Sequence, residues 1–182
     1  ESSFAVNMLA IDRGRPKILG LKELIACYIE HRREVVVRRT RFELRKAEER
    51  AETLEGFLIA LANLDEFIRI IRQSANRDEA RIKLLAFDFT RAQVEKLGIL
   101  IRSEARLVSG RYSFSEAQAN AILDLRLYQL TGLEIDKVRA EYHELTESIK
   151  DLLDILAKEA RVLAIIKSEL QTIKEKYATP RL

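Results

Sequence analysis

Residues 135–177 carry the feature that most limits how this sequence can fold, an apolar side chain that recurs at alternating steps of three and four residues. The positions are Ile135, Val138, Tyr142, Leu145, Ile149, Leu152, Leu156, Leu163, Ile166, Leu170, Ile173 and Tyr177. This spacing is the heptad pattern of a coiled-coil seam, the apolar stripe along which two helices pack. No Gly or Pro interrupts the segment, and only Glu159 breaks the apolar pattern. A helix of this length spans about 65 Å, so we expect a partner helix in the chain.

A similar pattern earlier in the chain supplies that partner. Within residues 31–74 the apolar residues again step by three and four, although the seam drifts near Asp65 and Gly56 costs about 1 kcal/mol relative to Ala. Because the two segments are about equally long, we predict an antiparallel two-helix coiled coil. Its predicted seam consists of Leu44, Ala51, Leu54, Leu58 and Leu61 in the first arm and Val138, Tyr142, Leu145, Ile149, Leu152, Leu156, Leu163, Ile166 and Leu170 in the second.

Composition agrees with a mainly α fold, since 47% of the 182 residues are hydrophobic, 34% are charged and only six are Gly. Alternating apolar residues and a turn signal predict a short β-hairpin within residues 3–19. A lone hairpin is barely stable, so we expect the sequence to be part of a longer protein. The expected order is the end of a preceding domain (1–20), a connecting helix (21–30), the first arm (31–74), a small helical globular head that caps the coiled coil (75–134), the second arm (135–178) and a tail (179–182).

The most informative stretch of the head is residues 113–134. Ser115 followed by Gln118 predicts a capping box at a helix start, and Gly132 is a suitable helix end. Apolar residues occupy two faces of the predicted helix at 115–131, whereas a helix with one core to bury needs one stripe. The second stripe predicts a second contact, made either with the rest of the head or with another copy of the chain.

This stretch also resembles a known family. Residues 118–134 read QANAILDLRLYQLTGLE, which closely resembles a signature of the A subunits of bacterial DNA gyrase, and topoisomerase IV A subunits have a similar stretch. The resemblance continues through FAVNM at 4–8, Pro16-Lys17-Ile18, and HRREVVVRRTRFEL at 31–44. It covers nearly the whole chain in the right order, and the gyrase subunit is the better match.

The resemblance implies a part in a type IIA DNA topoisomerase, a bacterial cytoplasmic, nucleoid-associated enzyme that supercoils DNA by ATP-dependent strand passage. In that family a long antiparallel coiled coil carries a globular head, and two heads meet to form the exit gate (C-gate) for DNA. The hairpin would be the last piece of the tower domain. The implied partners are a second copy of the chain, DNA and the gyrase B subunit, which would hold the ATP and Mg²⁺. The head contact would include Ala119, Ile122, Leu123, Leu127 and Leu130.

A run of basic residues is the candidate ligand site. The net charge is +3, but residues 1–46 hold 11 Lys or Arg against 6 Asp or Glu. One interpretation is a solvated helix surface paired with Glu34 and Glu43. The other is a weak, sequence-independent contact with DNA phosphates, made by Arg32, Arg33, Arg38, Arg39 and Arg41.

No catalytic or metal-ligating residue is predicted in this segment. Arg111-Tyr112 imitates the arginine–tyrosine pair with which the family cleaves DNA, but its surroundings match the head, so we expect a structural role. His31 and His143 lack ligand spacing, and no Gly-rich phosphate loop is present. We therefore expect the segment alone to be inactive and to bind no cofactor.

Two other functions fit a helical hairpin, a nucleic-acid-binding arm like that of seryl-tRNA synthetase and an intracellular coiled-coil scaffold. The acidic balance of residues 48–71 argues against the first, and the N-terminal hairpin argues against the second. The lone Cys27 favours a reducing compartment, and no run of 18 apolar residues predicts a membrane span. Glu159 weakens the seam, so we hypothesise that the second arm bends there when the gate opens.

Overall fold

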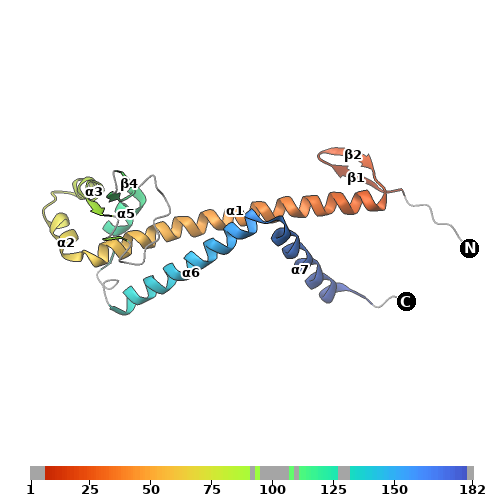
Figure 1. Ribbon diagram of the computed structural model, residues 1–182. Helices are drawn as coiled ribbons and strands as arrows, with labels where there is room; N and C mark the ends of the chain where they lie inside the picture. Colours follow the sequence, from red (N-terminus) through yellow and green to blue (C-terminus); the bar gives the residue numbers. More distant parts are fainter. Residues whose placement is uncertain (1–6, 91–92, 95–106, 109–110, 127–131, 180–182) are drawn as a thin grey trace, which may run out of the picture. The chain divides into compact units, whose positions relative to one another are not determined.

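The computed structural model describes residues 7–90, 93–94, 107–108, 111–126 and 132–179, without the side chains of residues 107, 108 and 133. Its helices are α1 (Leu21–Ala62), α2 (Leu64–Arg72), α3 (Arg77–Leu85), α5 (Glu116–Leu123), α6 (Gly132–Ala157) and α7 (Glu159–Tyr177), and its strands are β1 (Leu9–Asp12), β2 (Arg15–Ile18), β3 (Asp88–Thr90), β4 (Leu107–Val108) and β5 (Arg111–Ser113) (Figure 1). The mainly α fold with one long helix and an N-terminal β-hairpin is therefore confirmed.

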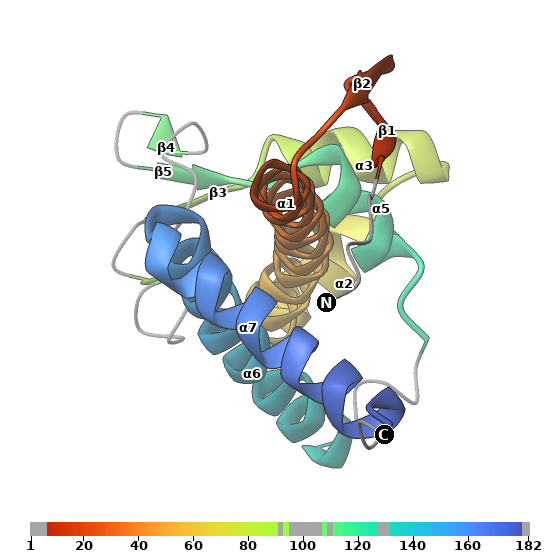
Figure 2. The ribbon, with the colours of Figure 1, turned by 90° about the vertical axis from the view of Figure 1, so that its right-hand side faces the viewer.

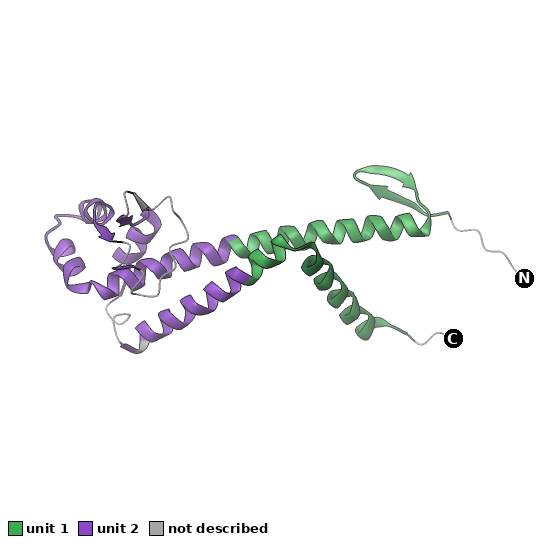
Figure 3. Cartoon of the chain, in the orientation of Figure 1, with its two compact units in different colours: residues 1–44, 151–182 green, residues 45–150 purple. Residues whose placement is uncertain are grey.

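The chain forms two compact units, which we describe one at a time (Figure 3). Unit 1 combines residues 1–44 with residues 151–182, and unit 2 consists of residues 45–150. The boundary between the units falls inside α1 and inside α6, whereas the predicted domains followed the order of the chain. No helix in the described ranges is both long and apolar enough to cross a membrane.

Unit 1 begins with the hairpin of β1 and β2, in which Leu9 is paired with Ile18 and Asp12 with Arg15. Arg13 and Gly14 connect the strands with φ values of 48° and 76°. Two successive residues with positive φ are typical of the two-residue turns whose twist matches a hairpin. Glycine adopts this conformation without strain, which explains Gly14. The Leu19 N–H then donates to the Met8 carbonyl at 2.9 Å and extends the pairing.

The first long helix differs from the prediction at both ends. The predicted connecting helix (21–30) and first arm (31–74) begin as one helix, α1, because no breaker separates them. The predicted arm is nevertheless too long, since α1 ends at Ala62 and a separate helix, α2, follows. Asn63 leaves the helical conformation, and its side-chain amide donates to the Ile59 carbonyl at 2.9 Å.

An aromatic cluster forms the core of the head in unit 2. The rings of Phe67, Phe87, Phe89 and Phe114 lie with centroids 4.9–6.1 Å apart, within the range of favourable aromatic pairs. Phe67 is 2% exposed, and the break at Asn63 is what places its helix, α2, separately from α1. Strand β5 lies between β3 and β4 in a small antiparallel sheet (Figure 2).

The return segment is also divided. The sequence predicts one helix over 135–178, but the structure has α6 up to Ala157 and α7 from Glu159. The prediction of a single helix is therefore wrong at Lys158. The residue type does not explain the break, because lysine is a good helix former. Gly132, which the sequence suggested as a helix end, is instead the first residue of α6.

Candidate functional site

The break at Lys158 is the first unusual feature with functional potential. Lys158 has an extended backbone, with φ of −121° and ψ of 108°. Its N–H still donates to the Asp154 carbonyl at 3.1 Å, and its carbonyl accepts from the Arg161 N–H at 3.0 Å. One residue thus leaves the helix while the hydrogen bonds on either side persist. The break lies directly before Glu159, where the sequence predicts a bend.

Charged side chains surround the break. Lys158 Nζ lies 2.5 Å from Asp154, and Arg161 contacts Asp154 at 3.1 Å and Asp151 at 2.7 Å. The hydrogen bond from Lys158 lowers the pKa of Asp154, and the hydrogen bond to Asp151 raises the pKa of Arg161. These groups are solvated, so each ion pair adds little to stability.

A small apolar core joins α7 to α1 within unit 1. Its buried members come from α1, the end of α6 and α7, and they are Val36, Ile155, Val162 and Ile166. Val37 and Ile165 pack against them and are partly buried. The core is small, so it fixes α7 at one short stretch of α1.

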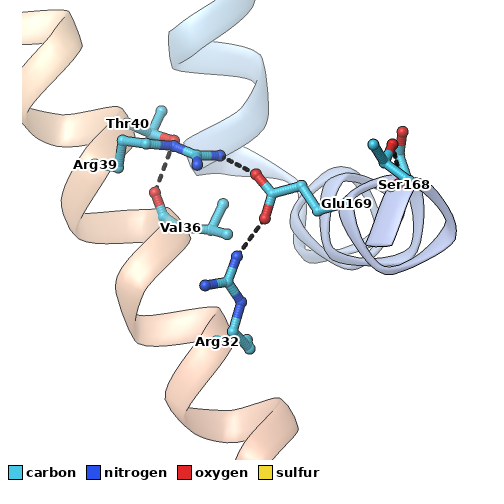
Figure 4. A network of polar contacts seen from close by, with 7 residues as sticks. Arg32, Val36, Arg39, Thr40, Ser168 and Glu169 are labelled. Atoms are coloured by element: carbon cyan, nitrogen blue, oxygen red, sulfur yellow. Dashed lines mark hydrogen bonds and ion pairs between the residues drawn. The ribbon is translucent and has the colours of Figure 1, made fainter. Parts of the chain in front are cut away.

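Beside this core Glu169 of α7 lies between two arginines of α1 (Figure 4). Its Oε1 accepts from Arg39 at 2.7 Å, and its Oε2 accepts from Arg32. The hydrogen bond from Arg39 is the main reason that the pKa of Glu169 is lowered. Arg33 contacts Glu159 at 3.0 Å and, less closely, Glu30. We call Arg32, Arg39 and Glu169 the Glu169 cluster.

These contacts divide the predicted phosphate-binding run. Arg32, Arg33 and Arg39 are engaged by carboxylates of α7, so they are partly neutralised. Arg38 and Arg41 are exposed, and within the described ranges neither has an ion pair. Among the described residues, the carboxylates that pair with Arg32, Arg33 and Arg39 belong to Glu30, Glu159 and Glu169. The sequence had predicted Glu34 and Glu43 as the partners.

A second organised site lies in unit 2 around Gln118, the first-turn glutamine of α5. Gln118 is fully buried, and its Nε2 donates to the Glu52 carbonyl at 2.8 Å and to the Tyr112 hydroxyl at 2.9 Å. Its Oε1 accepts from the Ser115 N–H at 3.1 Å, and the Gln118 N–H donates to Ser115 Oγ, which confirms the predicted capping box. We call Gln118 and its partners the Gln118 cluster.

The backbone of α1 approaches this cluster closely at Gly56. A Cβ at this position would lie 3.0 Å from both Cβ and Cγ of Gln118, which is tighter than most contacts of a real Cβ, so Gln118 would have to shift by a few tenths of an ångström. Gly56 is therefore more than a tolerated weakness of the helix, because it lets α5 contact α1 directly. Ser115 Oγ also donates to the Glu52 carboxylate at 2.6 Å, beside the same contact.

The predicted head contact is only partly available for a second copy. Ala119 and Ile122 are 0% and 5% exposed within the single chain, so neither side chain is accessible to a second copy in this structure. The docking of Gln118 onto α1 turns this face of α5 inward. Leu123 is half-buried, whereas Leu127 and Leu130 lie outside the described residues. Helix α5 ends at Leu123, earlier than the predicted helix at 115–131.

The predicted seam residues differ in burial along the chain. Ala51, Leu54, Leu58, Tyr142, Ile149 and Ile166 are buried, and the half-buried members are Leu44, Leu61, Val138, Leu145, Leu152 and Leu156. Leu163 and Leu170 are 44% and 37% exposed, so in this structure they lie outside the buried part of the predicted seam. Beyond the break, α7 presents Val162, Ile166 and Glu169 to α1 instead.

Tyr112 belongs to the Arg111-Tyr112 pair that imitates the DNA-cleaving pair of the family in sequence. It is 1% exposed, and its ring packs edge-on against Phe114 at 6.2 Å. Its hydroxyl accepts from Gln118 Nε2. A nucleophile must reach its substrate, so this burial favours the structural role. The described residues also contain no group of three or more His, Cys, Asp or Glu able to hold a metal.

Sequence reasoning missed Glu169, Glu52 and Glu55. Glu169 lies outside the apolar seam pattern, and only its contacts identify it. Glu55 is 8% exposed and accepts from the Tyr142 hydroxyl at 3.1 Å. The sequence did contain a signal for Glu55, because Tyr142 occupies a seam position and the hydroxyl of a buried tyrosine needs a hydrogen-bond partner.

Comparison with known proteins agrees with the resemblance. The family model for the A subunit of DNA gyrase/topoisomerase IV matches residues 1–171. The chain is 47% identical over 181 residues to the A subunit of DNA gyrase from Streptococcus pyogenes serotype M3 and to that from Streptococcus pneumoniae serotype 4. It is 42% identical over 191 residues to that from Aeromonas salmonicida. These matches cover 100% of the chain but 19–21% of each relative, so the chain spans about a fifth of their length. The chain belongs to the family of DNA gyrase and topoisomerase IV A subunits.

Proposed function

We propose that this segment is the dimerisation and exit-gate module of a DNA gyrase A subunit, which holds two subunits together while DNA passes through. The observation that carries the proposal is the Gln118 cluster. It joins the head to α1 by buried hydrogen bonds and close packing, so a force on the head is transmitted to the helix rather than absorbed by a loose joint.

The contact between subunits then uses residues other than Ala119 and Ile122. Large apolar side chains exposed on the head are Ile68 and Ile71 of α2 and Ile82 of α3, at 38%, 40% and 62%. Exposed apolar groups favour association with a second surface. We propose that these residues, together with Leu123, Leu127 and Leu130, supply the contact.

In the assembled enzyme, ATP and Mg²⁺ would be held by the gyrase B subunit, and the present residues would act on neither. The segment would therefore cleave no DNA by itself. We place the assembled enzyme in the bacterial cytoplasm with the nucleoid, since its substrate is DNA.

Sedimentation equilibrium of the 182-residue chain tests the proposal. A dimer is expected at concentrations on the order of tens of micromolar, as for a contact of micromolar affinity. Ile82→Glu should weaken the dimer, because it places a charge in an apolar contact. Ile11→Glu is the matched control, since Ile11 is 79% exposed in unit 1 and should leave the dimer unchanged. A monomer at these concentrations contradicts the proposal.

One observation also favours a weak DNA contact, the exposure of Arg38 and Arg41 on α1. Two phosphate contacts would give a small, salt-dependent affinity. Replacing both with Ala should lower the DNA affinity of the parent enzyme at low salt and reduce its salt dependence. Replacing Arg32 and Arg39 is a poorer test, because those side chains already bind Glu169. An affinity that stays the same at every salt concentration removes the DNA contact.

A further inference from the structure

Two apolar faces in unit 1 are left uncovered, one on each long helix. The face on α1 consists of Leu21, Ile25, Tyr28 and Ile29, whose side chains are 39–63% exposed. The face on α7 consists of Leu163, Leu170, Ile173 and Tyr177, whose side chains are 37–75% exposed. Solvated single apolar residues need no explanation, but two continuous stripes on helices that already touch do.

The outer ends of the two stripes lie equally far from the core that the two helices share. Leu21 lies fifteen residues before Val36 on α1, and Tyr177 lies fifteen residues after Val162 on α7. Val36 and Val162 belong to the same buried core. If α7 ran antiparallel to α1 from that core, equal helix lengths would bring Tyr177 opposite Leu21 and Ile173 opposite Ile25. Leu21, Ile25 and Tyr28 also share a face of α1 with Val36, since their spacings follow the helical period.

The described position of α7 leaves this pairing open. Within unit 1, α7 contacts α1 near Val36, and its C-terminal end then diverges from the first turns of α1 (Figure 3). A groove remains between them, lined by Ile29 of α1 and by Leu163 and Leu170 of α7. The groove is therefore bordered by members of both stripes.

We propose that α7 alternates between two registers on α1, the described one and a closed one in which Leu170, Ile173 and Tyr177 cover Tyr28, Ile25 and Leu21. Ile166 is common to both faces of α7, so the change is a swing at Lys158 with a rotation of roughly 50° about the helix axis. The heptad pattern that continues through the break belongs to the closed register.

The Glu169 cluster selects the described register. Glu169 faces Arg32 and Arg39 only when α7 presents the face of Val162 to α1, and Glu159 contacts Arg33 in the same position. In the described register these ion pairs are formed and the stripes are solvated. In the closed register the stripes are covered and Glu169 turns away from its arginines. The opposing terms are a few exposed ion pairs and a set of apolar contacts, so neither register excludes the other. The inference concerns one chain and does not depend on dimerisation.

Disulfide formation in the 182-residue chain tests the closed register. In a Cys27→Ser background, Ile25→Cys and Ile173→Cys form an intramolecular disulfide only if their Cα atoms approach within about 7 Å. The control pair is Lys22→Cys with Glu175→Cys, since these exposed residues lie on faces turned away from the proposed contact. We expect the first pair to oxidise at least about tenfold faster, because only its Cα atoms meet the disulfide distance. Equal rates, or no disulfide in the first pair, overturn the proposal.

The role of Glu169 has its own test in the same background. Glu169→Gln keeps the size of the side chain but removes its charge, and it should raise the oxidation rate of the 25–173 pair by about threefold, the scale of an exposed ion-pair cluster. Glu175→Gln is the matched control, because Glu175 lies on α7 and, among the described residues, its side chain hydrogen-bonds only within that helix, to Gln171. An unchanged rate with Glu169→Gln overturns the selection by this cluster. Helix content measured by circular dichroism confirms that each variant is folded.

Discussion

The Gln118 cluster in unit 2 and the Glu169 cluster in unit 1 both attach a helix to α1, but by different physical means. Gln118 is fully buried and makes neutral hydrogen bonds beside a glycine that permits close approach. Glu169 is partly solvated and makes ion pairs with two flexible arginines. Buried hydrogen bonds leave costly unpaired groups when broken, whereas solvated ion pairs are exchanged for water at little cost. The first contact is suited to a permanent joint and the second to one that opens.

Replacing Gln118 should have the largest effect on this contrast. Gln118→Leu removes hydrogen bonds to the Glu52 carbonyl, the Tyr112 hydroxyl and the Ser115 N–H, so we expect a loss of about 3 kcal/mol in unfolding free energy. Urea unfolding followed by circular dichroism measures it. Gln171→Leu is the control, since Gln171 is exposed and, within the described part of the chain, its side chain hydrogen-bonds only to Glu175. Equal losses for the two variants would show that burial adds nothing to the Gln118 contact.

A methyl group at Gly56 should act next most strongly. Alanine favours a helix by about 1 kcal/mol over glycine, but the added Cβ would meet Gln118 at 3.0 Å. We therefore expect Gly56→Ala to lower the unfolding free energy by about 1 kcal/mol, because overpacking a fixed side chain costs more than the helix gains.

The control for Gly56 is Gly132→Ala, since a Cβ at Gly132 has no neighbour within 4 Å. That variant should be neutral or slightly more stable. A stabilised Gly56→Ala variant would show that Gln118 shifts easily and that the Gln118 cluster is no more rigid than the Glu169 cluster.

Loss of the Glu169 charge should matter less and depend on salt. Glu169→Gln should lower the unfolding free energy by about 0.5 kcal/mol in dilute buffer. The difference from the unsubstituted chain should shrink towards zero near 1 M salt, where the screening length is about 3 Å. The urea midpoint at two salt concentrations tests this, with Glu175→Gln as control. A loss that persists in high salt would show that the Glu169 cluster behaves like the buried Gln118 contact and not like a solvated ion pair.

Acid should produce the smallest effect, through the same carboxylate. The contact with Arg39 lowers the pKa of Glu169, so the ionised form stabilises the fold above the ordinary pKa of glutamate, roughly 4.3. That contribution is lost as the pH falls through the lowered value. The difference between the chain and Glu169→Gln should therefore vanish in strong acid. A constant difference from neutral pH into strong acid would contradict this assignment.

The sequence predicted features that depend on local patterns. The heptad steps indicated long helices, Ser115 and Gln118 indicated the capping box, and the Asp12–Pro16 segment indicated a hairpin turn. It failed where tertiary contacts decide. Asn63 ends α1 although no Gly or Pro stands there, because α2 separately contributes Phe67 to the aromatic core. The sequence assigned Ala119 and Ile122 to a contact with a second copy, although both are buried in the single chain. An apolar stripe on a helix does not reveal that the neighbouring Gln118 docks that face onto α1.

The candidate site shows the same division. The basic run was visible in the sequence, but its neutralisation by Glu169 was not, because the two are 130 residues or more apart. The sequence suggested only a bend at Glu159 from one charged seam position, whereas the structure has a break in the helix one residue earlier, at Lys158. Exposed positions such as Arg38 carry no packing pattern, so their function stays a prediction.

The break at Lys158 also exposes the chain to proteases. Trypsin-like enzymes need a basic side chain on a segment of extended backbone, and Lys158 provides both, exposed and without a side-chain cap on the helix that follows. Helical residues must first unfold locally before they are cleaved. Most Lys and Arg near Lys158 lie within helices, whereas Lys158 itself already has the extended backbone that cleavage requires. Mild digestion should therefore cut there early, and the time course of this single cleavage would report how accessible the break is to a protease.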